Sequence, residues 1–496
     1  MVGDILSIVR SYENSESSRI NPDERPLFHV SPLLGWMNDP NGFSVYQGEY
    51  HLFYQYYPYD TVWGPMHWGH VKSKDLIHWE YLPCALAPDS DSDREGCWSG
   101  SAVETPDGRH MLLYTGRMPV NRNEGEEHIL QVQCLAFGDG HDYDKYEGNP
   151  VITEADLPEG ASIYDFRDPK LWWDEMENAY MALIGNRAPD GSGQLLLYRS
   201  TDAVHWDFLN VLESCRNEYG KMWECPEFFE IDGTAFILIS PQDMSYGGEF
   251  QNRHGNMLLS GTYDPDTHTF TRKEVHAIDF GYDFYATQTL KSEDGRRIMI
   301  AWMQAWENRF SGKRDGGRGW TGMMTVPREL RVKNGRLLQT PVRELELCRK
   351  NPVSVKEYAL SSEASLPGIS GRCIDMTVHV AVPDGGSTCR FEMRLAQNES
   401  YRSVFSCDMT SGACLFDRTN SGYADDVLPV RRTQLDSNLR ELTLRVIIDR
   451  LSVEIFINGG EKVMTSVIYT PAEAREISFT AEGSLLLDVE KYDIVL

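Results

Sequence analysis

Short runs of apolar and aromatic residues, each opened by a turn-forming residue, recur along the first two thirds of the chain. Aromatic and β-branched residues are frequent in them and helical periodicity is weak, so each run predicts a β-strand. Their starts lie 60, 70, 55 and 62 residues apart, which indicates a repeated unit of several strands. The runs are GEYHLFYQY from Gly48, GRHMLLYTG from Gly108, NAYMALIGN from Asn178, GTAFILISP from Gly233 and GRRIMIAWM from Gly295.

A second pair of similar segments supports this repeat. SKDLIHWEYL (Ser73 to Leu82) and STDAVHWDFL (Ser200 to Leu209) follow the first and third runs at similar distances. Five copies of a unit with several strands are typical of a five-bladed β-propeller.

The pattern changes from about Lys356 onward, where apolar and polar residues alternate. In LTLRVIIDRLSVEIFINGGE, alternate residues form the apolar faces of two strands, and Asn458-Gly459-Gly460 predicts the hairpin turn between them. These faces contain Leu442, Leu444, Val446 and Ile448 in the first strand and Val453, Ile455 and Ile457 in the second. Such alternation predicts an antiparallel β-sandwich.

The whole chain is therefore predicted to be all-β, with two domains. Residues 1–24 form an N-terminal extension, 25–340 the propeller, 341–355 a linker with one short helical piece, and 356–496 the sandwich. A length of 496 residues agrees with two domains, because one compact core rarely serves so long a chain.

Composition and charge narrow the classes of function. The net charge of −28 repels phosphate backbones and anionic lipids, so we expect neither nucleic acid nor a membrane as partner. The ten cysteines contain no C-x-x-C pair, which favours reduced thiols. The N-terminus has no basic segment followed by a long apolar one, and no apolar stretch is long enough to span a bilayer. We expect a cytoplasmic protein.

Three acidic residues fall at the same phase of the repeat. Asp39 and Glu224 lie nine residues before the starts of their runs, and Asp168 lies ten before its own. This phase corresponds to the innermost strand of a blade, so one end of the propeller axis would collect the three carboxylates. The other two blades place CWSGS (97–101) and YDFYATQT (282–289) there, which adds aromatic rings and hydroxyl groups.

Each acidic motif also has a purely structural interpretation. NDPNG is typical of a turn, FRDP is compatible with a surface ion pair before a proline, and the glutamate of WECPEF is compatible with a position at the rim. The shared phase of the three acids favours a site. The turn interpretation is compatible with it, because a rigid Asp39-Pro40 turn would fix the direction of the carboxylate.

Two opposed carboxyl groups suit the cleavage of glycosidic bonds, one as nucleophile and the other as acid and base. Glu224, beside Trp223 and near other acids, is expected to hold a proton and act as the acid. Asp39, hydrogen-bonded by backbone N–H groups of its turn, is expected to stay ionised and attack. Asp168 is expected to stay ionised beside Arg167, and to grip sugar hydroxyls and stabilise the transition state.

WMNDPNG, FRDP and WECP resemble the three signatures of the invertase and fructan-hydrolase family, glycoside hydrolase family 32. The resemblance extends from about Arg25 to the C-terminus, through RPLFHVSP, FYQYYP, WGHVKSKDLIHW, FYATQT, MTVPREL and SVEIFINGGE. It implies a five-bladed propeller followed by a β-sandwich, retaining hydrolysis of β-fructofuranosides, and no metal or organic cofactor.

The resemblance also implies residue roles: Asp39 as nucleophile, Glu224 as acid/base and Asp168 as transition-state stabiliser. It implies sugar contacts from Asn38, Gln55, Trp63, Trp98, Ser99 and Arg167, and we add the rings of Trp36 and Tyr282 as substrate-binding residues. Where the family often has phenylalanine, this chain has Trp98, which keeps an aromatic wall.

Other residues near these motifs are not assigned to the site. His67 and His70 lack a third ligand at a recognisable spacing, so structural roles are favoured over a metal site. Cys225 has no evident partner base, so packing around Glu224 is favoured over nucleophilic attack. Trp302, Trp306 and Trp320 belong either to the core of blade five or to leaving-group contacts, and the sequence does not separate these.

The exact substrate stays open at this stage between sucrose, sucrose 6-phosphate and short fructo-oligosaccharides. RFSGKRDGGR, with Arg309, Lys313, Arg314 and Arg318, would suit a phosphorylated sugar, although a solvated loop is the favoured interpretation. Fructosyl transfer or exo-fructanase activity would use the same acids, and a non-catalytic fructan-binding protein would be expected to lose one of them. The sequence leaves homo-oligomer formation open.

Overall fold

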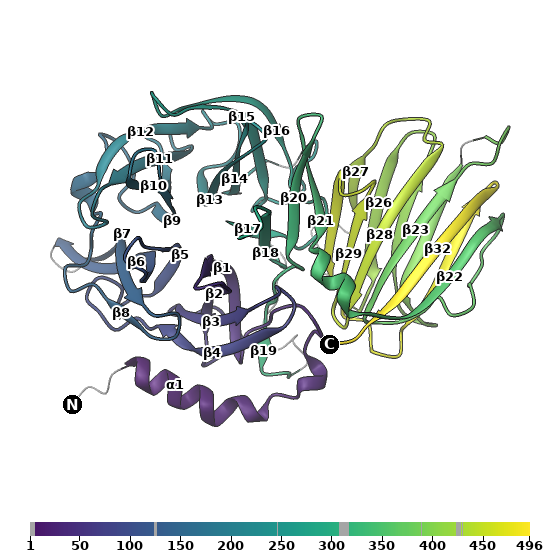
Figure 1. Ribbon diagram of the computed structural model, residues 1–496, viewed down its shortest axis with the longest axis horizontal. Coiled ribbons are helices and arrows are strands. Elements are labelled where there is room, and N and C mark those ends of the chain that lie inside the picture. Colours follow the sequence, from purple (N-terminus) through teal and green to yellow (C-terminus); the bar gives the residue numbers. More distant parts are fainter. Residues whose placement is uncertain are drawn as a thin grey trace.

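The computed structural model describes residues 5–123, 126–245, 247–306, 317–387, 389–422, 428 and 430–496. Figure 1 shows a ring of five sheets next to a domain of two packed sheets. The all-β class, the five-bladed propeller and the C-terminal sandwich are thereby confirmed. Within the described residues, no helix is long and apolar enough to cross a membrane.

Each blade is one antiparallel sheet, and its bounds are as follows. The first contains β1 (Gly35–Tyr46), β2 (Glu49–Tyr57), β3 (His67–Ser73) and β4 (Trp79–Leu86), with the short β19 (Trp320–Thr321) parallel to β1. The second contains β5 (Cys97–Glu104), β6 (His110–Asn123), β7 (Glu126–Gly138) and β8 (Tyr143–Lys145). The third contains β9 (Phe166–Asp174), β10 (Ala179–Arg187), β11 (Gly193–Ser200) and β12 (Asp207–Ser214). The fourth contains β13 (Met222–Ile231), β14 (Thr234–Gln242), β15 (Met257–Asp264) and β16 (Thr269–His276). The fifth contains β17 (Tyr285–Lys291), β18 (Arg297–Trp302), β20 (Arg328–Lys333) and β21 (Arg336–Pro341).

The first strands of the five blades, β1, β5, β9, β13 and β17, surround the axis. Each contacts the next around the ring, and β17 closes it against β1. The phase predicted for the acids is confirmed, because Asp39 lies in β1, Asp168 in β9 and Glu224 in β13. All five apolar runs form the second strands of their blades.

The two similar segments adopt one local structure. Asp75 and Asp202 each accept hydrogen bonds from the backbone N–H groups two and three residues later and from a histidine ring. The tryptophan that follows donates to a backbone carbonyl three residues earlier in both. The similarity of sequence therefore reflects the same turn between the third and fourth strands of two blades.

The C-terminal sandwich has two antiparallel sheets. One is ordered β22 (Arg349–Leu360), β32 (Leu485–Ile494), β23 (Ile374–Ala381), β28 (Glu441–Asp449), β29 (Ser452–Ile457) and β30 (Lys462–Val467). The other is ordered β27 (Val430–Gln434), β26 (Ala413–Asn420), β25 (Arg402–Asp408), β24 (Arg390–Gln397) and β31 (Glu476–Glu482). The apolar faces predicted for β28 and β29 are buried. Within the predicted linker, the 3₁₀ helix η4 (Arg343–Cys348) is followed at once by β22, so the sheet begins seven residues earlier than expected.

The N-terminal extension is largely helical. It contains α1 (Ile5–Glu16) and the 3₁₀ helices η1 (Ser17–Arg19) and η2 (Pro22–Glu24), while η3 (Glu154–Asp156) lies between blades two and three. α1 packs against β4, as Figure 1 shows, with Val9 fully buried and the Glu13 carboxylate accepting a hydrogen bond from the Cys84 backbone at 3.1 Å. The extension is thus tied to the first blade.

A buried ionic cluster joins the propeller to the sandwich. The two ring nitrogens of His29 lie 2.8 Å from Asp449 and 2.9 Å from Glu454, and Arg328 pairs with Glu454 at 2.6 Å. Burial alone would lower the pKa of His29, but the hydrogen bonds to both carboxylates raise it to about 9. Both nitrogens therefore carry protons at neutral pH.

This cluster predicts that the protein loses stability in mild alkali. Because the pKa of His29 is higher in the folded protein than its ordinary 6.5, the stabilisation is complete below about pH 6.5 and is lost as the pH rises through about 9. The full effect is on the order of 3 kcal/mol. Calorimetric melting of His29→Gln should show lower stability at neutral pH and a flatter pH dependence over this range than the wild type. His205→Gln, at an exposed histidine, serves as control, and parallel curves for His29→Gln and the wild type would contradict the assignment.

Candidate active site

All five innermost strands are irregular where they approach the axial end. Each of them shifts its pairing register against the second strand of its blade. The shifts lie between Met37 and Pro40 in β1, Trp98 and Gly100 in β5, Glu224 and Glu227 in β13, and Tyr285 and Gln288 in β17, and β9 has a shift at the same level. Asp168, Cys225 and Ala286 have left-handed backbone conformations at these bulges, with φ of 64°, 49° and 53°. An extra residue in a strand changes the direction of the neighbouring side chains, which positions the acids.

This irregularity replaces the turn expected at NDPNG. The segment lies inside β1, where two bulges accommodate Asp39-Pro40 and Asn41-Gly42. The prediction of a hard turn is therefore wrong, because pairing with β2 continues on both sides of the bulges. The carboxylate of Asp39 is fixed in direction by a strand rather than by a turn.

The three acids meet around Cys225. The sulfur of Cys225 lies 3.6 Å from Asp39 Oδ2 and 3.5 Å from Asp168 Oδ2, and its backbone N–H donates to Asp168 Oδ2 at 3.0 Å. Glu224 is the preceding residue. Cys225 is buried and has a pKa well above its usual value because of burial and the nearby carboxylates, which agrees with a packing and polar role.

Asp39 is held by one oxygen only. The hydroxyl of Ser99 donates to Oδ2 at 2.8 Å, whereas Oδ1 is buried without a hydrogen-bond partner among the described residues. Burial and the charge of Glu224 raise the pKa of Asp39 to about 6. The expected cage of backbone N–H groups is not observed in the described chain, so Ser99 and Cys225 orient this carboxylate instead.

Asp168 does not pair with Arg167 as the sequence suggested. Consecutive side chains diverge at the bulge, so Arg167 binds Glu224 and Asp165, while the carboxylate of Asp168 turns to Cys225. Burial and the charge of Glu224 raise the pKa of Asp168 in spite of the nearby guanidinium. Arg167 therefore does not hold the pKa of Asp168 low, contrary to the expectation.

Glu224 is fixed at both carboxylate oxygens. Arg167 Nε donates to Oε1 at 2.8 Å, and the hydroxyl of Tyr285 donates to Oε2 at 2.5 Å. Tyr285 was missed in the sequence, although it belongs to the FYATQT motif. β17 begins at Tyr285 and has a bulge directly after it, which directs this ring toward the axis. The sequence does not show where this bulge lies, so it does not distinguish Tyr285 from the other residues of the motif.

Tyr282, predicted to bind substrate, lies away from the acids. Its ring is fully buried at the contact with the sandwich, where its hydroxyl donates to the Phe416 carbonyl and Arg418 lies over its face. The preceding Gly281 approaches β30 so closely that a Cβ atom would come within 2.0 Å of the Thr465 carbonyl oxygen. This close approach directs Tyr282 toward the sandwich and away from the acids.

The other predicted sugar contacts surround the acids. The indole of Trp36 donates to Asn38 at 2.8 Å, and its ring belongs to an aromatic cluster that also includes Tyr285 and Trp98. Trp63 is 41% exposed and packs edge-on against Trp98, whose buried indole nitrogen has no hydrogen-bond partner among the described residues. Gln55 is buried in β2 and donates to the Cys97 carbonyl.

Three tryptophans left undecided by the sequence are now placed. Trp302 is buried against Trp36 and Trp306, and Trp306 stacks on Trp36 at 6.3 Å between ring centroids. Trp320 is buried under the guanidinium of Arg25. Trp302 and Trp320 therefore pack in the core, while the partly buried Trp306 covers an edge of the site.

The two histidines held to be structural make hydrogen bonds within the first blade. His67 Nδ1 donates a hydrogen bond to the Pro65 carbonyl at 2.9 Å, and His70 is hydrogen-bonded to His51. In the described ranges, no group of three ligating side chains is arranged to hold a metal ion. Arg309, Lys313 and Arg314 of the basic stretch lie outside the described residues, whereas Arg318 lies inside them.

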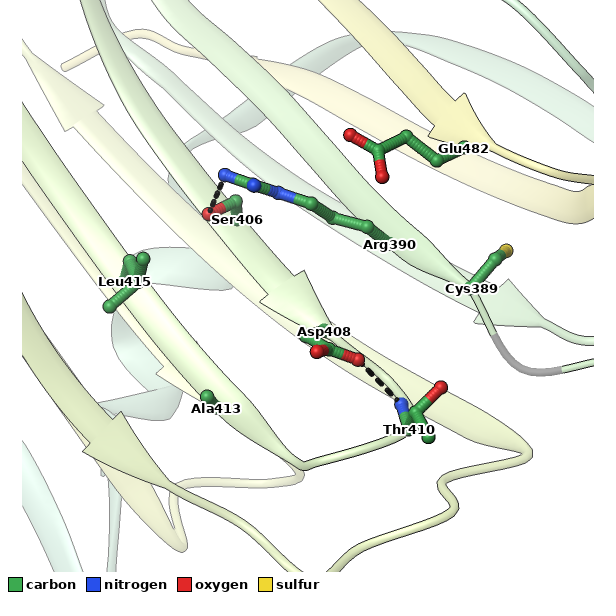
Figure 2. Close-up of a pocket in the computed structure, with 8 residues that line it drawn as sticks. All are labelled: Cys389, Arg390, Ser406, Asp408, Thr410, Ala413, Leu415 and Glu482. Atoms are coloured by element: carbon green, nitrogen blue, oxygen red, sulfur yellow. Dashed lines mark hydrogen bonds between the residues drawn. The ribbon is translucent and has the colours of Figure 1, made fainter.

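A hollow on the sandwich, drawn in Figure 2, offers different chemistry. It measures about 530 Å³ and lies over β24, β25 and β26, where Arg390 donates to Ser406 at 3.3 Å. No aromatic ring is present among its described lining residues, and it lies on another domain from the three acids. The axial end of the propeller remains the candidate site.

A propeller that gathers three carboxylates, two of them buried, with an arginine and several tryptophans at one end has the components of a glycoside hydrolase. Models of the glycosyl hydrolases family 32 N-terminal domain and of the family 32 C-terminal domain match residues 29–341 and 344–494. The chain belongs to glycoside hydrolase family 32, and it acts on β-fructofuranosides.

Individual relatives agree. The chain is 38% identical to a sucrose-6-phosphate hydrolase of Escherichia coli over 92% of its own length and 91% of that protein's. It is 36% identical to a raffinose invertase of Escherichia coli over 97% of each. A mutant of the family 32 β-fructofuranosidase of Bombyx mori, solved in complex with sucrose, superposes with a TM-score of 0.84 at 33% identity, covering 100% of this chain and 99% of that one.

Proposed function

We propose that the protein hydrolyses terminal β-fructofuranosides with retention of configuration, through a covalent fructosyl intermediate on Asp39. The proposal rests on one observation: Asp39 Oδ2 is bound by Ser99 and Cys225, and the buried Oδ1 has no partner in the described chain. A carboxylate tethered by one oxygen and free at the other is oriented to attack an anomeric carbon.

Glu224 is the proposed acid and base. It is the least buried of the three acids, since Asp39 and Asp168 are 8% and 6% exposed while Glu224 falls in the half-buried range. A leaving group departs toward solvent, so the group that protonates it must be reachable from outside. Burial and the charge of Glu224 raise the pKa values of Asp39 and Asp168, so a proton is retained among the three acids near neutral pH.

Asp168 and Arg167 are the proposed stabilising pair. In the first step, Asp39 Oδ1 forms a bond to the anomeric carbon while Glu224 gives its proton to the departing oxygen. In the second, Glu224 removes a proton from water, which attacks the same carbon and releases Asp39. Asp168, next to both, accepts hydrogen bonds from fructosyl hydroxyls as positive charge develops on the ring.

Sucrose, sucrose 6-phosphate and short fructo-oligosaccharides are the proposed substrates, because relatives of similar length carry the names sucrose-6-phosphate hydrolase and raffinose invertase. Transfer of the fructosyl group to a second sugar would use the same acids. Hydrolysis and transfer are distinguished by the molar ratio of free fructose to the released leaving group, which is glucose when sucrose is the substrate. This ratio equals one for hydrolysis and falls below one for transfer.

The test is a comparison of kcat/KM for sucrose, sucrose 6-phosphate, 1-kestose and inulin, with glucose, glucose 6-phosphate and fructose quantified. We expect the di- and trisaccharides to exceed inulin and the product ratio to be close to one. The ranking of kcat/KM values identifies the preferred substrate. Failure to release fructose from any of the four would refute the proposal.

A further inference from the structure

A second hollow lies beside the site and has no part in the mechanism above. It measures about 360 Å³, within the usual range for small-ligand pockets. Four segments of the chain line it: the end of the N-terminal extension at 12–20, the start of β1 at 34–35, the loop after β2 at 58–61, and 317–319 before β19. Ile20 packs against Gly319, so the end of the N-terminal extension contacts the segment 317–319.

Aromatic rings form one wall of this hollow. The rings of Tyr12 and Tyr59 pack at 5.0 Å between centroids, and Tyr59 remains 39% exposed. An exposed ring of this type offers an apolar face next to a hydroxyl group. Such a face suits the C–H surface of a sugar ring.

The charged side chains of the hollow balance one another. Arg19 forms an ion pair with Glu16, and the hollow also contains Asp60 and Arg318. Arg318 has no side-chain hydrogen bond or ion pair within the described residues. Two guanidinium groups and two carboxylates give no net charge, which disfavours a phosphate and favours a neutral ligand rich in hydroxyl groups.

Two of the lining segments lead directly into the active site. Gly35 in the wall is followed by Trp36, and an extended strand places it at most about 14 Å along the chain from Asp39. The loop at 58–61 leads to Trp63, which packs against Trp98. The hollow is therefore within reach of a sugar unit attached to the leaving group.

We propose that this hollow binds the third, neutral sugar unit of a trisaccharide whose terminal fructose occupies the acids. This inference rests on the proposed function and deepens it, because it assigns a preference for uncharged oligosaccharides to a site built partly by the N-terminal extension. Tyr59 stacks on the sugar ring, and Asp60 and Arg318 hydrogen-bond its hydroxyl groups.

The test compares KM and kcat for sucrose, raffinose and 1-kestose in the wild type, Tyr59→Ala and Tyr59→Phe. We expect Tyr59→Ala to raise KM for both trisaccharides by about five- to tenfold, with kcat and the values for sucrose nearly unchanged. Tyr59→Phe should restore the trisaccharide KM, because it keeps the ring. Tyr358→Ala, an exposed tyrosine on β22, is the matched control, and thermal melting verifies folding.

The outcomes separate the two proposals. If Tyr59→Ala leaves trisaccharide KM unchanged while the wild type cleaves sucrose, the hollow is not a sugar site and the proposed function stands. If Arg318→Ala raises KM for sucrose 6-phosphate and not for raffinose, the hollow is an anion site and the inference is overturned. If the wild type cleaves no β-fructofuranoside, the proposed function itself fails.

Discussion

Replacement of Asp39 by alanine should lower kcat on sucrose by about 10³-fold or more while the protein stays folded. Neither of the other two acids of the site is placed to attack, because the backbone N–H and sulfur of Cys225 hold Asp168, and Arg167 and Tyr285 hold Glu224. Removing a buried carboxylate of raised pKa should not destabilise the fold. Steady-state kinetics and thermal melting of the variant measure both effects.

The pH profile gives an independent test of the same residue. Because the pKa of Asp39 is raised to about 6, the ionised nucleophile is depleted as the pH falls below that value, and kcat/KM of the wild type should decline there. The Ser99→Ala variant removes the hydrogen bond to Oδ2 and should move this acidic limb to higher pH. A residual activity of Asp39→Ala within tenfold of the wild type would remove Asp39 from the role of nucleophile.

Replacement of Glu224 by glutamine should affect substrates according to their leaving groups. For sucrose, whose leaving oxygen needs a proton, kcat/KM should fall by about 10²- to 10⁴-fold. For an aryl β-fructofuranoside such as the p-nitrophenyl derivative, the first step needs no proton and the loss should be much smaller. The ratio of the two losses is the measured quantity.

Glu230→Gln is the matched control for this variant. Glu230 lies in the same strand, β13, and is exposed at its far end, so its loss should leave both substrates unaffected. Equal losses for sucrose and the aryl substrate in Glu224→Gln would assign that carboxylate to binding or stabilisation rather than to proton transfer.

The architecture of the propeller followed from the sequence because each blade repeats a hydrophobic pattern. The runs starting near Gly48, Gly108, Asn178, Gly233 and Gly295 became the second strands, and counting back from them placed three acids on innermost strands. The buried faces of β28 and β29 followed from simple alternation. Periodicity reports which face of a strand is buried, and that was sufficient for the fold.

The details of the site did not follow, because they depend on bulges and on contacts between blades. A bulge separates Arg167 from Asp168 and sends the guanidinium across to Glu224 in the next blade. The start of β17 separates Tyr285, which contacts Glu224, from Tyr282, which packs on the sandwich. Neither the position of an extra residue in a strand nor the choice of partner across blades leaves a periodic signal.

The anomeric configuration of the first product tests the central claim, which is that three carboxylates at one end of the axis carry out a two-step displacement. The enzyme would be incubated with sucrose in water containing methanol, and the initial methyl fructofuranoside identified by NMR before it can be hydrolysed again. Two displacements at one carbon predict methyl β-fructofuranoside. Initial formation of the α anomer would require a single displacement by solvent and would contradict a covalent intermediate on Asp39.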